Sequence, residues 1–210
     1  SGDLSKRSNR YEVALKNPAI NDSDYNGEVE AHSTKIEYRR SQYDSDVKTK
    51  GFSVAAGKEV VRNTYVGARY GLDFIKEVYN YIPNSNVPIN KRFLDQDYTN
   101  SSITPYINYD STNDFYFPTA GIKAGASVEY AGVGGDSRYL KSTTYGKYFY
   151  SLEDLAELDW VLRLKTQMKI LVDNGQINQG DSLYLGGAKT LRGYKSYAFP
   201  NNDTGYSVLT

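Results

Sequence analysis

Apolar and polar residues alternate with a period of two along several long stretches of this chain. Between Tyr65 and Phe74, the residues Val, Ala, Tyr, Leu and Phe occupy every second position, and Gly, Arg and Asp occupy most of the positions between them. The stretch from Ile122 to Tyr130 repeats this arrangement. Alternation of this kind is typical of β-strands with two different faces. The pattern therefore predicts an all-β protein.

The alternation, together with the turn-rich stretches between the runs, predicts eight antiparallel strands. They are expected near residues 10–17, 27–39, 48–60, 63–79, 101–110, 121–131, 138–150 and 159–172. The second and seventh alternate poorly, so the pattern does not assign their faces. Ser151 begins a possible helix N-terminus, but the cleaner alternation from Trp160 onward favours a strand after a short turn. The segment Gly132–Asp136 lacks the Lys-Ser/Thr of a phosphate-binding loop and is expected to be a hairpin turn.

Three features of the predicted strands favour a transmembrane barrel over a soluble antiparallel sheet. The cleanest runs extend over about 10–14 residues, whereas soluble strands usually have about 5–6 and tilted membrane strands need about 9–11. The polar face combines charges with glycines, which suits a wet lumen. Many of the 21 tyrosines lie near predicted strand ends, where a membrane-interface girdle would place them: Tyr11, Tyr38, Tyr79, Tyr81, Tyr109, Tyr130, Tyr148 and Tyr150. The pattern alone leaves both architectures open.

Hydropathy gives little help with this choice. The mean hydropathy of −0.63 is polar, but a transmembrane barrel also averages out polar because its strands alternate. No run of apolar residues approaches the roughly 18 that a transmembrane helix needs. The first residues, Ser1 to Asp3, show no apolar signal-peptide segment. Either the chain is not exported, or it is a piece of a longer one.

Composition narrows the chemistry that the chain can perform. It has no cysteine and a single histidine, His32, which excludes thiol nucleophiles, disulfides and thiolate metal sites. His32 lies in no nucleophile-elbow motif, although a hydrolase that uses only carboxylates remains open. The 25 basic and 25 acidic residues balance, so a nucleic-acid-binding surface has no compositional support. Composition therefore supports neither a metal site nor a nucleic-acid partner, and we expect no metal, cofactor or nucleic acid to be bound.

The connection after the last predicted strand carries a motif from Leu185 to Tyr194. A glycine at 193 permits a positive φ or a close backbone approach. The Arg192 guanidinium offers five donors in a rigid fork that suits a buried carboxylate or an aromatic face, and Tyr194 is an amphipathic anchor. Taken alone, the motif fits an ordinary surface loop. Its candidate site residues are Gly186, Gly187, Thr190, Arg192, Gly193 and Tyr194.

Two further motifs precede this loop in the chain. Tyr11 to Pro18 is a strand pattern that ends in Asn-Pro, and residues 104–110 with 116–121 form a strand-turn pattern. In this order the three motifs resemble segments of the BamA-type outer-membrane barrel assembly factors, the last being their sixth loop. The resemblance gives four more candidate site residues: Asp110, Phe117, Pro118 and Gly121. Family members often carry arginine where Thr112 stands, so an ion pair from this position does not carry over.

The resemblance implies a sixteen-stranded antiparallel transmembrane β-barrel preceded by periplasmic POTRA domains. The chain would hold roughly the fourth to eleventh strands as a partial wall over residues 1–172, and the long inward loop over residues 173–210. It also implies that Arg192 braces the lumen against acidic residues beyond Thr210, with Gly193 allowing a close approach and Tyr194 packing against the wall.

The function implied by the resemblance is the folding and insertion of β-barrel proteins in the bacterial outer membrane, without catalysis. Its partners would be nascent outer-membrane β-barrel proteins, accessory assembly lipoproteins and outer-membrane lipid. The 210-residue chain alone is expected to self-associate through its strand edges. Two alternatives remain open: a translocation-assembly or two-partner secretion pore of the same superfamily, and a soluble tyrosine-rich β-sandwich that binds or hydrolyses carbohydrate.

Overall fold

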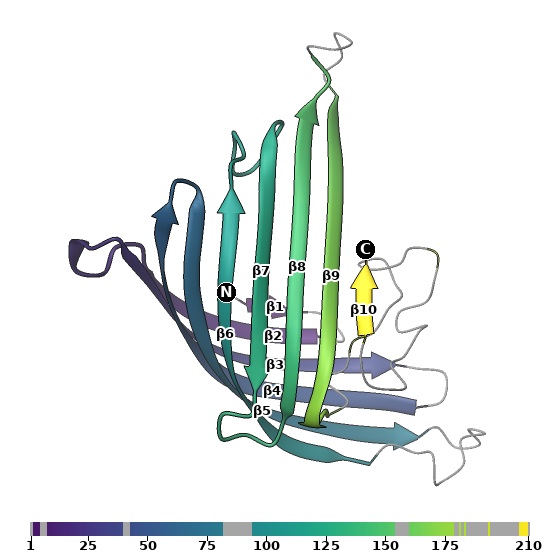
Figure 1. Ribbon diagram of the computed structural model, residues 1–210. Coiled ribbons are helices and arrows are strands. Elements are labelled where there is room, and N and C mark those ends of the chain that lie inside the picture. The colour runs from purple at the N-terminus through teal and green to yellow at the C-terminus, as the bar shows by residue number, and fades with distance from the viewer. Residues whose placement is uncertain are drawn as a thin grey trace.

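The computed structural model describes residues 2–4, 8–39, 43–81, 94–153, 160–178, 181, 183, 193 and 206–209. Their strands form one antiparallel sheet in which spatial order follows chain order (Figure 1). The short helix η1 (Ile20–Asp22) connects the second strand to the third. The strands are β1 (Gly2–Leu4), β2 (Ser8–Asn17), β3 (Tyr25–Arg39), β4 (Tyr43–Val61), β5 (Thr64–Tyr81), β6 (Gln96–Asp110), β7 (Gly121–Ala131), β8 (Arg138–Ser151), β9 (Val161–Gln176) and β10 (Tyr206–Leu209).

The eight predicted strands correspond to β2–β9, which confirms the all-β antiparallel prediction. The structure differs mainly at strand ends. β4 begins at Tyr43 and β6 at Gln96, each five residues before its predicted start. These added residues are largely polar on both faces, so they produce no hydrophobic alternation, yet their backbones continue the strand ladder. β9 continues to Gln176, past the expected boundary between wall and loop at residue 172.

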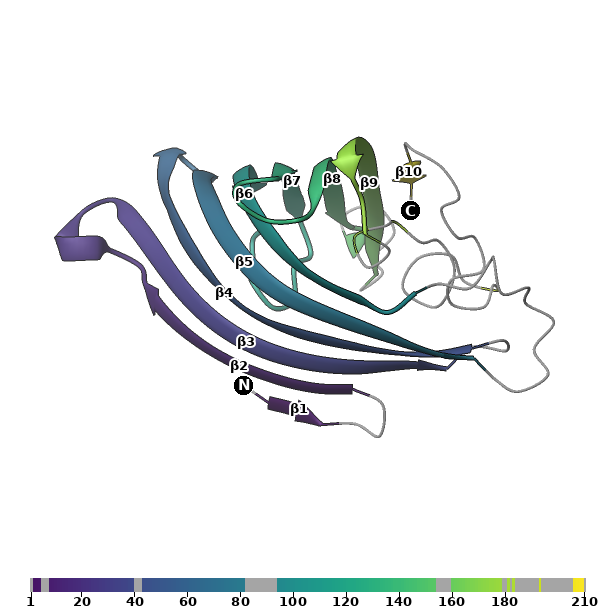
Figure 2. The same cartoon turned by 90° about the horizontal axis from the view of Figure 1, so that it is seen from below.

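The sheet curves strongly, so that its two faces are unequal. Figure 2 shows this curve from β2 at one side to β9 at the other. The Arg69 side chain of β5 reaches past β4 to Glu28 of β3, with 3.3 Å between Nη2 and Oε2. Side chains of strands that are not neighbours meet in this way only on the concave side of a curved sheet. Arg69 and Glu28 therefore identify the concave face.

The strand register assigns the remaining residues to the two faces, because paired residues point the same way. On β4, Ser53 and Ala55 are concave and buried, whereas Phe52 and Val54 are convex and exposed. The predicted face of β5 that contains Val66 is the convex one. The exposed convex side chains form an apolar belt, defined here by Val13, Leu15, Val29, Phe52, Val54, Val66, Phe74, Ile103, Ile107, Ile122, Val128, Leu162 and Leu164.

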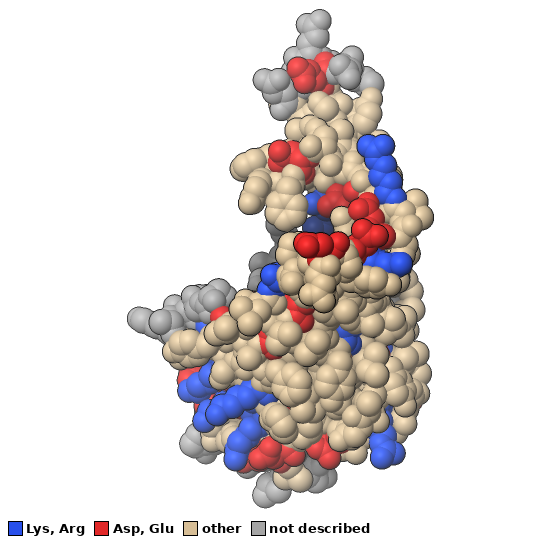
Figure 3. All heavy atoms as spheres, turned by 90° about the vertical axis from the view of Figure 1, so that its left-hand side faces the viewer, with Lys and Arg blue, Asp and Glu red and all other residues tan. Residues whose placement is uncertain are grey.

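Exposed aromatic residues border this belt, as predicted for Tyr109, Tyr130, Tyr148 and Tyr150. The prediction is wrong for Tyr38 and Tyr79, which pair in register with the concave Ser45 and therefore face the lumen. Tyr148 and Tyr150 stack at the end of β8, with ring centroids 6.4 Å apart. Tyr109 and Tyr130 occupy convex positions near the ends of β6 and β7. Figure 3 shows a broad uncharged area in the lower right of the view, with acidic and basic side chains grouped in its upper part and at the lower left. Within the described part of the chain, no helix is long and apolar enough to cross a membrane.

The strand connections divide between two ends of the wall. The turn end carries residues 18–24, 62–63, 111–120 and 152–160. The loop end carries residues 5–7, 40–42, 82–95, 132–137 and 177–205. The hairpin at 132–137 confirms the expected turn there. At the turn end, the Ser151 hydroxyl accepts a bond from the Glu153 amide, while Leu152 still pairs with Trp160.

Candidate functional site

A cluster of charged side chains occupies the middle of the concave face on β3, β4 and β5. Arg69 donates to the Ser53 hydroxyl at 3.0 Å and to Glu28 at 3.3 Å, and its Nη1 lies 3.7 Å from Glu30. The Nε2 atom of His32 lies 3.1 Å from the Asp73 carboxylate. The serine of this cluster thus bonds to arginine and not to histidine, so the cluster has no Ser-His-Asp arrangement.

Glycines on the concave face make room for large side chains from the next strands. A Cβ atom at Gly67 would stand 2.5 Å from the Tyr106 hydroxyl, and one at Gly125 would stand 2.5 Å from the Tyr145 ring. Each tyrosine can therefore lie against the sheet instead of standing upright in the lumen. This explains why the sequence alternates glycine and charge on the face that lines the lumen.

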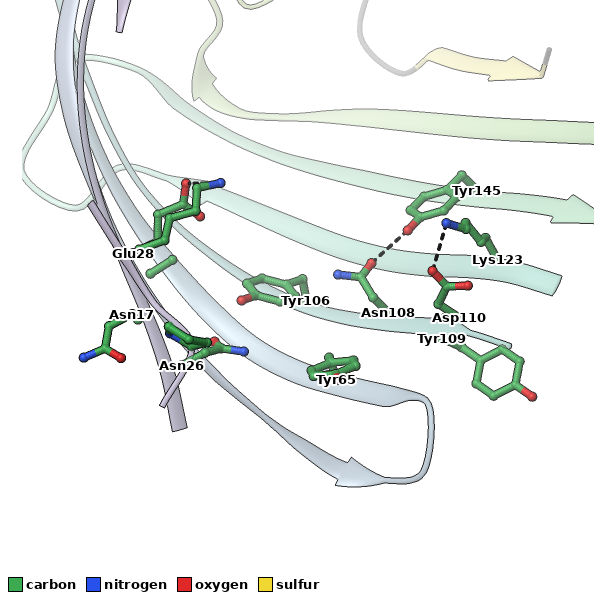
Figure 4. Close-up of a pocket in the computed structure, with 14 residues that line it drawn as sticks. Asn17, Asn26, Glu28, Tyr65, Tyr106, Asn108, Tyr109, Asp110, Lys123 and Tyr145 are labelled. Atoms are coloured by element: carbon green, nitrogen blue, oxygen red, sulfur yellow. Dashed lines mark hydrogen bonds and ion pairs between the residues drawn. The ribbon is translucent and has the colours of Figure 1, made fainter. Parts of the chain in front are cut away.

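These tyrosines line a pocket of about 620 Å³ on the concave face near the turn end (Figure 4). The Tyr145 hydroxyl donates a hydrogen bond to the side-chain oxygen Oδ1 of Asn108 at 3.1 Å. The Lys123 ammonium lies 2.9 Å from Asp110, and Lys16 lies 3.0 Å from Glu28. The pocket therefore offers aromatic faces, amide groups and paired charges. Among the described residues, no three His, Cys, Asp or Glu side chains are grouped to hold a metal ion.

The strand-turn signature builds a tight turn between β6 and β7. The side-chain oxygen Oδ1 of Asn113 accepts bonds from the Thr119 and Ala120 backbone amides, each at 3.1 Å. Pro118 is buried and Phe117 is exposed. Gly121 has a φ of 109°, and a Cβ there would stand 2.5 Å from the Ser111 carbonyl oxygen. Glycine is therefore required at this position for both conformation and space.

Asp110 of this signature is held by two groups. It accepts bonds from the Thr112 hydroxyl at 2.6 Å and the Thr112 amide at 3.1 Å, and it forms the ion pair with Lys123. Thr112 thus donates hydrogen bonds to Asp110, and the positive charge that pairs with the Asp110 carboxylate comes from Lys123 of β7. In the loop itself, bonds from the Phe117 and Tyr116 amides hold the pKa of Asp114 below its usual value.

The beginning of the long connection at the loop end packs on the concave face. Ile177 and Leu183 contact a buried cluster of Ala131, Tyr139 and Leu171, whose side chains all point into the concavity. Polar contacts extend this packing: the Ser137 hydroxyl donates to Asp181 at 2.8 Å and accepts a bond from Asn178 at 3.0 Å. We call these residues the loop anchor.

The loop motif itself lies almost entirely outside the described residues: Gly186, Gly187, Thr190, Arg192 and Tyr194 carry no structural description. Gly193 is described, and its φ of 90° lies in the left-handed region that favours glycine. The expectation that Arg192 braces the lumen therefore stays a prediction. The loop anchor places Ile177, Asn178, Asp181 and Leu183, at the start of the connection that carries the motif, on the concave face.

Lowering the pH from 7 to 5 is expected to stabilise the loop anchor by about 1 kcal/mol. Burial raises the pKa of Asp181 to about 6, and this outweighs the hydrogen bonds that favour the carboxylate. Because the folded state then takes up the proton before the unfolded state does, stability increases as the pH falls through 6 toward 3.8. Unfolding in detergent micelles at the two pH values measures the effect, and Asp181→Asn should reduce it. An unchanged pH dependence in that variant would contradict the assignment.

Several of these residues were not found from the sequence. Glu28 and His32 lie on a strand whose faces the pattern could not assign, and Ser137 with Asp181 lies in connections. The sequence does contain a signal for Glu28 and His32, because Glu28, Glu30 and His32 occupy every second position and therefore share one face of the strand. The loop anchor had no comparable signal, since its residues come together only through the strand register.

Comparison with known proteins supports this arrangement. The Omp85 superfamily domain matches residues 1–208. The crystal structure of BamA from Haemophilus ducreyi lacking POTRA domains 1–3 superposes with a TM-score of 0.72 and 20% sequence identity, over 94% of this chain. The chain spans 40% of that BamA chain, so its sheet corresponds to part of a larger barrel. The chain belongs to the Omp85 superfamily and is part of a bacterial outer-membrane protein.

Proposed function

We propose that this chain is part of an assembly factor that folds and inserts β-barrel proteins in the outer membrane. The superfamily and the BamA-like fold support an assembly-type role. The observation that carries the finer proposal is the loop anchor. It directs the start of the connection at residues 177–205 onto the concave face, as an inward loop requires.

The proposed activity needs no bond-making chemistry. The apolar belt contacts lipid, and the charged concave face keeps the lumen wet. The inward loop fixes the shape of the wall while client strands fold beside it. In this proposal Arg192 binds a lumen carboxylate, Gly193 permits the close approach, and Tyr194 packs against the wall. The partners are nascent outer-membrane β-barrel proteins and accessory lipoproteins.

The experiment is to replace Arg192 in the intact protein and to measure the assembly of other outer-membrane proteins. Arg192→Ala should weaken the barrel, because charge-assisted hydrogen bonds contribute roughly 1.5–3 kcal/mol and the carboxylate is left without its partner. Folded client barrels, counted by their resistance to unfolding in cold detergent, should decrease. Arg192→Lys should restore assembly only in part, since an ammonium cannot reproduce the planar fork.

The matched control is Lys189→Ala, which removes a charge from the same connection outside the Arg-Gly-Tyr triplet and should leave assembly unchanged. A pore function makes a different prediction. If Arg192→Ala increased the passage of polypeptide or ions through the barrel while client assembly stayed normal, a translocation or secretion pore would replace the present proposal.

A further inference from the structure

A row of lysines crosses the convex face at the loop end, immediately beyond the apolar belt. Lys35 of β3 pairs in register with Lys48 of β4, and Lys48 pairs with Lys76 of β5. Lys50 lies one step nearer to the belt, opposite Phe74. Paired residues point to the same face, so these four lysines and Phe74 share the convex surface. We call the four lysines the lysine row.

The lysine row is only partly neutralised by the protein. Lys35 lies 2.7 Å from Glu37, and Lys76 lies 3.9 Å from Asp97 in a pair whose side chains are largely exposed. Within the described part of the chain, neither Lys48 nor Lys50 has an ion pair, and both are exposed. Like charges directly opposite each other on neighbouring strands are destabilising. An anion bound across the row would remove this repulsion.

Charge on the convex face changes in layers along β3 and β4. On β4 the convex positions run from Val54 and Phe52 in the belt to Lys50 and Lys48, and then to Asp46. On β3 the lysine is likewise followed by an acid, Glu37. The acids thus lie farther from the belt than the lysines. The positive layer therefore lies between the apolar belt and the acidic layer.

We propose that the lysine row binds the phosphate groups of phosphorylated lipid headgroups in the outer leaflet. Two of the strand connections at the loop end, residues 82–95 and 177–205, are longer than any at the turn end. In outer-membrane barrels the longer loops face outward, so this end lies in the outer leaflet. Lysine side chains also suit this depth, because their stems lie along apolar surface while the ammonium remains in the headgroup layer.

The opposite margin of the belt is built differently. Lys58, also a convex residue of β4, lies near the turn end opposite Tyr25 and Val66. Its ammonium lies 5.1 Å from the centre of the Tyr25 ring. Because the Lys58 ammonium already has a favourable contact within the protein, we do not expect it to contribute to phosphate binding. Lys58 is therefore a matched control on the same strand and face.

The test measures the binding of lipid A, which carries two phosphates, to the intact protein in detergent micelles. The double variant Lys48→Gln/Lys50→Gln should weaken binding roughly tenfold to thirtyfold, because each lysine near a membrane surface contributes a modest attraction to anionic lipid. Lys58→Gln should bind as the unchanged protein does. Lys48→Arg/Lys50→Arg should keep the affinity and shows that loss in the first variant is not a folding defect.

Two further probes separate the lipid from simple anion binding. Lipid A without its phosphates should bind the unchanged protein as weakly as lipid A binds the glutamine variant. Inorganic phosphate should not displace lipid A at equal concentration. The proposal is overturned if the glutamine variant binds lipid A normally, if Lys58→Gln loses as much affinity, if removal of the phosphates has no effect, or if inorganic phosphate competes equally.

Discussion

Replacing Thr144 by arginine is expected to destabilise the wall by about 2–4 kcal/mol, the cost of an arginine on the lipid face near the middle of an outer-membrane barrel. Thr144 is an exposed convex residue in the middle of β8, paired with Ala126 of β7 and Met168 of β9. Both pairs place it among apolar side chains. Equilibrium unfolding of the intact protein in lipid vesicles measures the change.

The neighbouring residue provides a control with the same chemistry. Thr143 points to the concave face, opposite Ser127 and Lys169, where water can solvate an added guanidinium. Thr143→Arg should therefore cost much less than Thr144→Arg, although the residue type and the substitution are identical. If Thr143→Arg were the more damaging change, the convex face could not be the lipid face.

Truncating Tyr139 to alanine is expected to destabilise the protein by about 3–5 kcal/mol, as for other fully buried large side chains. Tyr139 has no exposed surface and packs with Ala131 and Leu171. Its hydroxyl accepts a bond from Asn100 at 2.9 Å and donates one to Glu129 at 2.7 Å. Because Ile177 and Leu183 rest on the same cluster, the loop anchor should loosen as well.

Two variants divide this effect into its parts. Tyr139→Phe keeps the ring and removes the hydroxyl, and it should cost about 1–3 kcal/mol because buried polar groups lose a partner. Tyr148→Ala, on the same strand but on the exposed convex face, should cost less than Tyr139→Ala. Thermal unfolding in micelles ranks the three variants. Equal losses at positions 139 and 148 would show that the concave cluster is not the core of this wall.

Most strands were predictable because successive side chains point alternately to lipid and to the wet lumen, so apolar and polar residues alternate along the sequence. Val66 and Arg69 differ in hydrophobicity for this reason, and the alternation of β5 follows directly. β3 was harder to assign, since it places Ser33 and Lys35 on the convex face beyond the belt, where polar side chains replace apolar ones. Its period of two persists in Glu28, Glu30 and His32.

The candidate site was predictable only where a local motif forms a local structure. The turn from Asp110 to Gly121 is of this kind, because its bonds join residues close in the chain. The loop anchor joins Ser137 to Asp181, and the charge cluster joins Glu28 to Arg69. Such contacts depend on the register and curvature of the whole sheet, which no short segment of sequence determines.

The two edges of the sheet are covered over only part of their length. β1 pairs with residues 9–11 of β2, and β10 pairs with residues 168–171 of β9. Over the rest of these strands, amide and carbonyl groups on the outer side have no strand partner within the described residues. Hydrocarbon cannot satisfy such groups, so each edge needs an added strand. Because that strand is recognised through its backbone, the edges constrain its length and direction far more than its sequence.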